Sequence, residues 1–193
     1  IMMLQADETN TRARKILLLK EAGINPYPQK LNVSCSLCDY LSLYGRLQPG
    51  EMTQNDEMVA GRVVGVRNIH GVAFVDVMQE HKYLQLYLRR DNLRSSYDLF
   101  INTIDRGDWI CARGNPCKTK RGELSLLVND WNMMCKATRE IPFGKIDKRS
   151  GKKYSGVSDP QIVRRWPEIA LATNPVDYAV AVTRSKLISA IRN

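Results

Sequence analysis

The chain has 193 residues, of which 44% are hydrophobic, and its formal net charge is +9 at pH 7. This length corresponds to one domain with extensions or to two small domains, and the apolar content is sufficient for one core. The positive excess favours a polyanionic partner, with nucleic acid ahead of a membrane surface, although a basic protein without such a partner has the same composition. No apolar run approaches the roughly 18 residues that cross a bilayer, which argues against a membrane protein.

A first helix is predicted in the stretch TRARKILLLKEAG, residues 11–23. Thr9 or Asn10 can cap its start, and Gly23 provides the left-handed stop that ends it. The basic residues of this segment lie off its apolar side, and they are Arg12, Arg14, Lys15 and Lys20. They form either a solvated face or a face that contacts phosphates.

A second, short helix is predicted in SLCDYLSLYG, where Ser36 and Asp39 have the spacing of a capping box and Gly45 ends the helix. Cys35 and Cys38 form a lone CxxC pair without a second pair or a nearby histidine, so we expect no metal site. The chain has five cysteines, and this odd count indicates reduced thiols rather than a disulfide framework.

From Val59 onward the hydrophobic period changes from helical to two. Strands are predicted at 59–67, 72–78, 82–88, 108–118 and 123–133, with a mostly helical stretch at 92–104. The tight links NIHG and TKRG join the first two and the last two strands. Five short strands with a helix between the third and the fourth are typical of the OB-fold barrel.

After Cys135 the pattern loosens, and the basic stretch GKIDKRSGKKYSG, residues 144–156, is predicted to be a flexible connector. A final helix is predicted at 176–192. We therefore expect a mainly β fold, a five-stranded OB-fold barrel at 51–136, with an amino-terminal helical extension at 1–50 and a carboxy-terminal linker and helix at 137–193.

Residues for catalysis are scarce. The two histidines, His70 and His81, lie near turns without a cysteine or serine partner at a recognisable spacing. Residues 144–152 do not satisfy the phosphate-loop pattern G-x-x-x-x-G-K-[ST]. We expect no catalytic residue and no cofactor in this chain.

Binding residues are better supported by the alternation of two neighbouring strands. Phe74, Tyr83 and Tyr87 share the outward face, where OB-folds hold single-stranded nucleic acid by stacking. Gln85 lies between the tyrosines and can read a base edge, as can Arg67 at the end of the first strand and Glu123 at the start of the fifth. The alternative is a half-exposed strand face with incidental aromatics.

The same segments resemble the anticodon-binding domain of class II lysyl-tRNA synthetases. The resemblance runs from about Arg12 to Leu127 and rests on GINPYP, YGRLQPGE, VAGRVVGVR, LQLYL and GNPCKTKRGELSLL. The strand pair alone would also suit the aspartyl and asparaginyl enzymes, whereas KTKRGELS together with GINPYP selects the lysyl group, and LQPGE points to its eukaryotic branch.

The resemblance implies that this domain binds the uridine-rich anticodon of a lysine tRNA. It implies that Phe74 stacks on the central uridine, and that Gln85, Arg67 and Glu123 contact base edges. Phosphate contacts are expected at basic residues, namely Arg12, Arg14, Lys15, Lys118 and Lys120.

The resemblance also implies a longer parent protein, because the chain begins with Ile1 and reaches only the helix that leads into the first class II motif. That parent would be a homodimeric ligase that charges tRNA with lysine using ATP and magnesium, in the cytoplasm or in an organelle. The stretch DPQIVRRWPEIALATNP keeps Asp159, Pro160, Arg165 and Asn174 but loses most of the intervening family pattern. Two alternatives stay open, namely a sequence-tolerant OB protein that binds single strands and a non-catalytic synthetase paralogue that binds protein.

Overall fold

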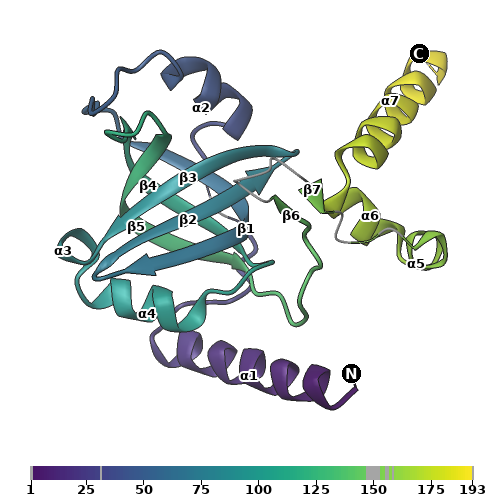
Figure 1. Ribbon diagram of the computed structural model, residues 1–193, viewed down its shortest axis with the longest axis horizontal. Helices are drawn as coiled ribbons and strands as arrows, with labels where there is room; N and C mark the ends of the chain where they lie inside the picture. Colours follow the sequence, from purple (N-terminus) through teal and green to yellow (C-terminus); the bar gives the residue numbers. More distant parts are fainter. Residues whose placement is uncertain (1, 31, 147–152, 155–156, 158, 193) are drawn as a thin grey trace. The chain divides into compact units, whose positions relative to one another are not determined.

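Five β-strands close into a barrel whose neighbours follow the order β1-β2-β3-β5-β4 (Figure 1). The strands are β1 Glu57–Ile69, β2 Val72–Gln79, β3 Lys82–Arg89, β4 Trp109–Lys118 and β5 Leu124–Cys135. β3 and β5 run parallel, and the other neighbouring pairs are antiparallel. The structure is a computed structural model and describes residues 2–30, 32–146, 153–154, 157 and 159–192. The predicted OB-fold barrel is confirmed.

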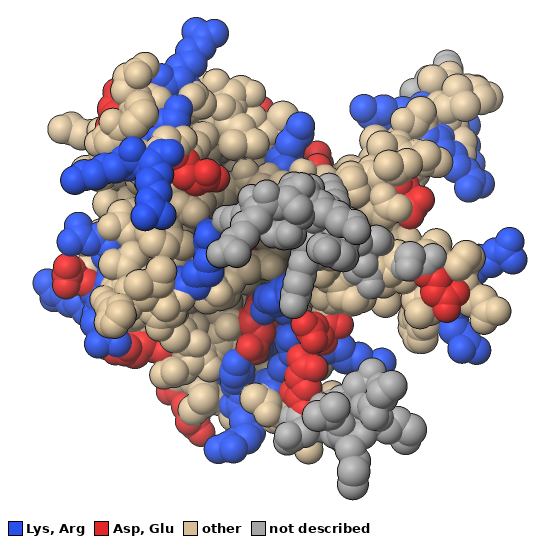
Figure 2. All heavy atoms as spheres, in the orientation of Figure 1, with Lys and Arg blue, Asp and Glu red and all other residues tan. Residues whose placement is uncertain are grey.

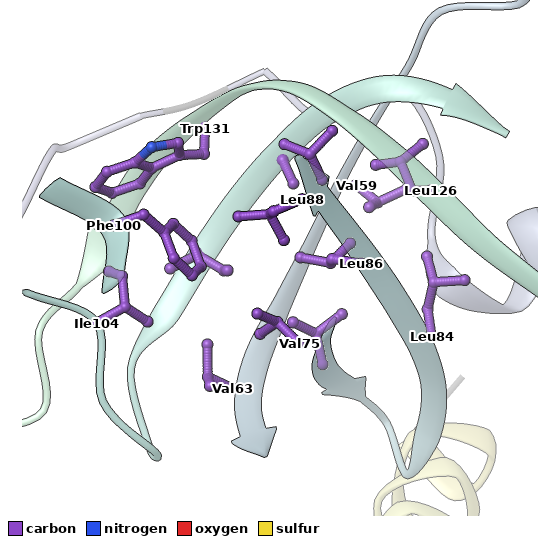
Figure 3. Packing of buried hydrophobic residues seen from close by; sticks show 14 of the residues in the cluster. Val59, Val63, Val75, Leu84, Leu86, Leu88, Phe100, Ile104, Leu126 and Trp131 are labelled. Carbon is purple, nitrogen blue, oxygen red and sulfur yellow. The ribbon is translucent and has the colours of Figure 1, made fainter. Parts of the chain in front are cut away.

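The core fills the barrel because alternate residues of each strand point inward (Figure 3). The residues of β2 and β3 in this core are Ala73, Val75, Val77, Leu84, Leu86 and Leu88. Between β3 and β4 lie two helices, α3 Arg90–Leu93 and α4 Ser95–Thr103, in place of the single predicted one. α4 places Phe100 edge-on against Trp131, with ring centroids 5.0 Å apart.

Two tight turns set the register of the first three strands. His70 and Gly71 connect β1 to β2, and Glu80 and His81 connect β2 to β3; the backbone φ of all four residues is positive. A two-residue turn with two positive φ values has the right-handed twist that flanking antiparallel strands need. The link predicted in NIHG is therefore confirmed.

The amino-terminal helix α1, Met2–Glu21, begins several residues before the predicted cap, and Thr9 and Asn10 lie inside it. Gly23 follows it with a φ of 77°, as expected for a left-handed stop. Figure 1 shows α1 beside α4, beneath the barrel. The second helix, α2 Leu37–Tyr44, has the predicted cap, because the Ser36 side chain accepts a hydrogen bond from the backbone N–H of Asp39.

A buried ionic cluster joins α1 to the barrel. The ammonium group of Lys136, after β5, is fully buried and lies 2.7 Å from carboxylate oxygens of both Asp105 and Asp108. The ammonium group of Lys15 on α1 lies 2.6 Å from the other oxygen of Asp105. Asp108 also accepts hydrogen bonds from the backbone N–H groups of Asp105 and Ala137, so the buried charges are paired and hydrogen-bonded.

The chain divides into two compact units, residues 1–140 and 141–193. The second unit contains a short antiparallel pair, β6 Lys145–Ile146 and β7 Lys153–Tyr154, and three helices, α5 Pro160–Arg165, α6 Pro167–Thr173 and α7 Pro175–Arg192. Most of the connector predicted at 144–156 lies outside the described residues. The three-part division at 50/51 and 136/137 stays a prediction.

Polar side chains cap two of these helices. Asp159 accepts a hydrogen bond from the backbone N–H of Gln161 at the start of α5, and Asn174 accepts one from Val176 at the start of α7. The predicted final helix is confirmed and begins at Pro175. Among the helices of the described chain, none has the length and apolar character needed to cross a membrane.

Candidate nucleic-acid interface

The outer face of β1, β2, β3 and β5 carries the predicted binding residues in rows that run across the strands. The strand register defines one row, which consists of Arg67, Phe74, Tyr87 and Leu127. It defines a second, neighbouring row of Gly65, Asp76, Gln85 and Ser125. Three of the four predicted base-contacting residues, Arg67, Phe74 and Gln85, therefore lie on adjacent rows of one surface.

Phe74 and Tyr87 form a stacked pair at the centre of this face. Their rings are nearly parallel, with an interplanar angle of 7° and centroids 5.2 Å apart. Offset stacking at this distance is a favourable aromatic geometry. Because Tyr87 covers the ring of Phe74 on the β3 side, the ring face towards β1 and Arg67 is the one on which a base can stack.

Asp76 pairs with Arg67, the register partner of Phe74 on β1. One guanidinium nitrogen of Arg67 lies 3.2 and 3.3 Å from the two carboxylate oxygens of Asp76. Both side chains are partly exposed, so the pair contributes only about 0–1 kcal/mol to stability. The pair orients the side chain of Arg67. Because the pair is weak, a base edge or a phosphate can replace the carboxylate of Asp76 at little cost.

Gln85 is oriented by Ser125, its partner on β5. The Ser125 hydroxyl donates a hydrogen bond of 3.1 Å to the amide oxygen of Gln85. The amide NH2 group of Gln85 therefore faces away from Ser125, and it can donate to the carbonyl oxygens of a pyrimidine. Ser125 itself is fully buried, and its backbone oxygen accepts a 2.9 Å hydrogen bond from the hydroxyl of Tyr40 on α2.

Glu123 and Tyr83 lie at the edge of the face. Glu123 is exposed and precedes β5, two residues before Ser125, and its backbone is fixed by two hydrogen bonds with Thr119 across the β4–β5 turn. Tyr83 is 48% exposed and is not part of the stacked pair. Partial burial raises the pKa of Tyr83 above its ordinary value of 10.0, so its phenol is neutral at physiological pH.

The predicted phosphate contacts divide into internal and outward groups. The prediction for Arg12 needs correction, because its side chain is 5% exposed and its guanidinium donates hydrogen bonds to the backbone oxygens of Arg106 and Ala137. Lys15 is bound to Asp105, and the ammonium group of Lys118 donates to the backbone oxygens of Gly45 and Leu47. Arg14 and Lys120 are exposed, and phosphate contacts there stay predictions.

The predicted set of site residues lacks three features, namely Asp76, Ser125 and the pairing of Tyr87 with Phe74. Strand alternation already places Asp76 and Tyr87 on the outward face, so their position was visible in the sequence. Their partners depend on the register between strands, which fixes that Asp76 is opposite Gln85 and that Phe74 is opposite Tyr87.

The cysteines and acidic residues form no metal centre in the described part of the chain. Cys35, Cys38, Cys111, Cys117 and Cys135 are all free thiols. Burial raises the pKa of the Cys111 thiol to about 11, which keeps it protonated and unreactive. No three His, Cys, Asp or Glu side chains among the described residues come together as metal ligands would.

Comparison with known proteins identifies a family model that matches the barrel. Residues 58–134 match the tRNA anticodon family, which is described as an OB-fold nucleic acid binding domain. The chain is 33% identical to a lysine–tRNA ligase of Christiangramia forsetii over 97% of its own length and 33% of that protein's. It is 29% identical to a lysine–tRNA ligase of Clostridium perfringens over 97% of the chain and 35% of that protein.

An archaeal relative shows a similar level of identity. The chain is 33% identical to a lysine–tRNA ligase of Sulfolobus acidocaldarius over 80% of its length and 32% of that protein. The chain thus spans about a third of the length of the curated relatives it matches. The resemblance to lysyl-tRNA synthetases is confirmed, and residues 58–134 match the model of the OB-fold nucleic acid binding domain.

Proposed function

We propose that this chain binds the anticodon loop of a lysine tRNA as the anticodon-binding part of a lysine–tRNA ligase. The observation that carries the proposal is the stacked Phe74–Tyr87 pair on the outer face, with Arg67 as the register partner of Phe74 on its other side. A single-stranded base can stack there, whereas a base inside a duplex has both of its faces covered. The net charge of +9 supplies the attraction for the phosphate backbone.

Selectivity would come from the two rows acting together. A base on Phe74 would present its edge to the neighbouring row, where the Gln85 NH2 group donates and Asp76 accepts. Uridine offers carbonyl acceptors and one N–H donor on that edge, which suits this pair of groups. Arg67 would contact a base edge or a phosphate of a flanking nucleotide, and Glu123 would contact a base edge.

We further propose that the chain serves a homodimeric class II ligase of the cytoplasm that uses ATP and magnesium. Identity to lysine–tRNA ligases over most of the chain supports this role. The described residues do not themselves fit magnesium, because no suitable cluster of ligands is present among them. In this proposal their part in the reaction is to select and hold the tRNA.

A binding experiment tests the proposal against the sequence-tolerant alternative. The 193-residue chain is titrated with a fluorescent stem-loop that carries the lysine anticodon, and with the same stem-loop whose central uridine is replaced by cytidine. We expect at least about a tenfold preference for uridine, because cytidine exchanges an acceptor and a donor on the edge that Gln85 and Asp76 read. Equal affinity for the two would identify a general single-strand binder instead.

A further inference from the structure

A hollow at one end of the binding face has the character of a phosphate site. Its volume is about 470 Å³, and it is lined by His70, Gly71, Val72, Arg89, Arg90 and Asp91. These residues come from the β1–β2 turn and from the junction of β3 with α3. Figure 2 shows blue basic side chains, interspersed with red acidic ones, around the part of the barrel where α3 lies.

Arg89 belongs to the same face as the aromatic pair. On β3 the alternation that points Gln85 and Tyr87 outward does the same for Arg89. Its register partner on β2 is Val72, so the Val72–Arg89 row is the next one after the Phe74–Tyr87 row. Two residues along a strand correspond to about 7 Å, which places Arg89 beside the stacked rings.

The guanidinium of Arg89 is available to an anion. It pairs with Asp91, at 3.2 Å, and the two side chains are 45% and 80% exposed. An ion pair this open to water is weak and screened by salt. A phosphodiester can replace the carboxylate and accept two parallel hydrogen bonds from the guanidinium fork.

Arg90 also lines the hollow, but its charged group is directed elsewhere. One guanidinium nitrogen of Arg90 lies 2.6 Å from a carboxylate oxygen of Asp98 on α4. Its guanidinium carbon lies 5.3 Å from the centre of the Tyr97 ring, within the range of a cation–π contact. Arg90 therefore holds α4 against the barrel, although its side chain is no less exposed than that of Arg89.

We propose that the hollow binds a phosphodiester group of the RNA next to the nucleotide whose base stacks on Phe74, and that Arg89 is the cation that holds it. This inference rests on the proposed binding of an anticodon loop to the outer face. The proposed contact is with a phosphate and not with a base. Arg89 therefore contributes affinity and fixes the path of the RNA backbone, whereas Phe74 and Gln85 contribute selectivity.

The test compares Arg89→Gln with a matched control, Arg113→Gln, in the 193-residue chain. Affinity for the lysine stem-loop is measured between 50 and 300 mM salt, in RNAs with and without the central uridine. For Arg89→Gln we expect a loss of about 3- to 10-fold that is equal for both RNAs. We also expect the slope of log affinity against log salt to fall by about 0.7, which corresponds to one phosphate contact.

The control and a reciprocal variant give the opposite results. Arg113 on β4 is an exposed arginine that pairs with Asp56 and does not line the hollow. Arg113→Gln should therefore leave both affinity and salt slope nearly unchanged, with circular dichroism confirming that the chain is folded. Asp91→Asn should tighten binding, because it removes the competing carboxylate. Replacing single phosphates beside the central uridine with neutral methylphosphonates should weaken binding to the unchanged chain but not to Arg89→Gln.

The outcomes separate this inference from the proposed function. If Phe74→Ala weakens binding and Arg89→Gln leaves the salt slope unchanged, the phosphate site is wrong and the anticodon proposal stands. If the unchanged chain does not distinguish the two RNAs but Arg89→Gln still lowers the slope, the phosphate site stands without the anticodon. No binding to either RNA overturns both.

Discussion

Phe74 on β2 and Tyr87 on β3 are direct cross-strand partners, and their rings stack within 7° of parallel on the outside of the barrel. An outward aromatic pair contributes little to a core that already fills the barrel. It does create an apolar platform on the outer face, and such a platform is what a single-stranded base requires. The first two predictions rest on this stacked pair.

Replacing Phe74 with alanine should weaken binding of the lysine stem-loop by about 1–3 kcal/mol, because a base loses its stacking partner. The barrel should remain folded, since Phe74 is outside the core. Fluorescence anisotropy measures the affinity, and Tyr83→Ala is the matched control from the same face. A loss for Tyr83→Ala as large as that for Phe74→Ala would show that the base stacks elsewhere.

Replacing Tyr87 with leucine should reduce the selectivity for a central uridine by more than the contact area of the Tyr87 side chain suggests. Tyr87 acts through Phe74 by fixing the plane of its ring, so the preference for a central uridine should shrink along with the affinity. Tyr87→Phe keeps the ring and should restore both quantities. A phenylalanine variant as weak as the leucine variant would mean that the hydroxyl group, and not the stack, is what matters.

Changing Gln85 to glutamate should abolish selective binding, although the two side chains have the same shape. The change replaces the NH2 donor with a second carboxylate directly opposite Asp76. Like charges on opposite strands repel each other, and both repel RNA. Gln85→Met, which removes the donor without adding charge, should lose selectivity but retain more affinity; equal losses would exclude the electrostatic part of this explanation.

Lys136→Met tests the ionic cluster beneath the barrel. The substitution leaves the fully buried carboxylate of Asp108 without its cation, and we expect a loss of about 3–5 kcal/mol in the free energy of unfolding. Denaturant titration measures it. Adding Asp108→Asn removes the unpaired charge and should recover part of the loss, whereas a double variant as unstable as the sum of the two single variants would contradict this account.

The same cluster predicts how stability depends on pH. Burial alone raises the pKa of Asp105, but hydrogen bonds from Lys136 and Lys15 outweigh it and hold the pKa below its ordinary value of 3.8. The ionised group therefore stabilises the folded chain fully above pH 3.8, and this contribution is lost as pH falls through the lower folded-state pKa. The stability difference between the unchanged chain and Asp105→Asn should shrink below pH 3.8 in denaturant titrations. A difference that stays constant down to pH 2 would disprove the assignment.

Strand alternation made the barrel predictable from sequence. Every second residue from Ala73 to Val77 and from Leu84 to Leu88 is apolar, and a two-residue turn leaves little freedom for the register. The predicted limits of β2 and β3 therefore agree with the observed ones at the start of each strand and differ by one residue at its end. The same alternation identified the outward residues of the candidate site, among them Phe74 and Gln85.

Features that depend on distant partners were less predictable. The expected single helix at 92–104 breaks at Arg94, where φ is 51°, and no glycine or proline marks the break. Arg12 has the sequence surroundings of an exposed cation, yet besides the nearby Glu8 its guanidinium donates to the backbone oxygens of residues 106 and 137. Local pattern cannot reveal a partner about a hundred residues away, so the burial of Arg12 follows only from the fold.

The β2–β3 turn limits which changes of sequence this protein can tolerate. Its two residues, Glu80 and His81, occupy left-handed backbone conformations without being glycine, so the turn keeps its length at some conformational cost. One inserted residue would shift the register by one and exchange the faces of β3, moving Tyr87 and Gln85 into the core. Substitutions on this surface can change which RNA it binds, whereas the insertion of one residue in the β2–β3 turn would remove the surface.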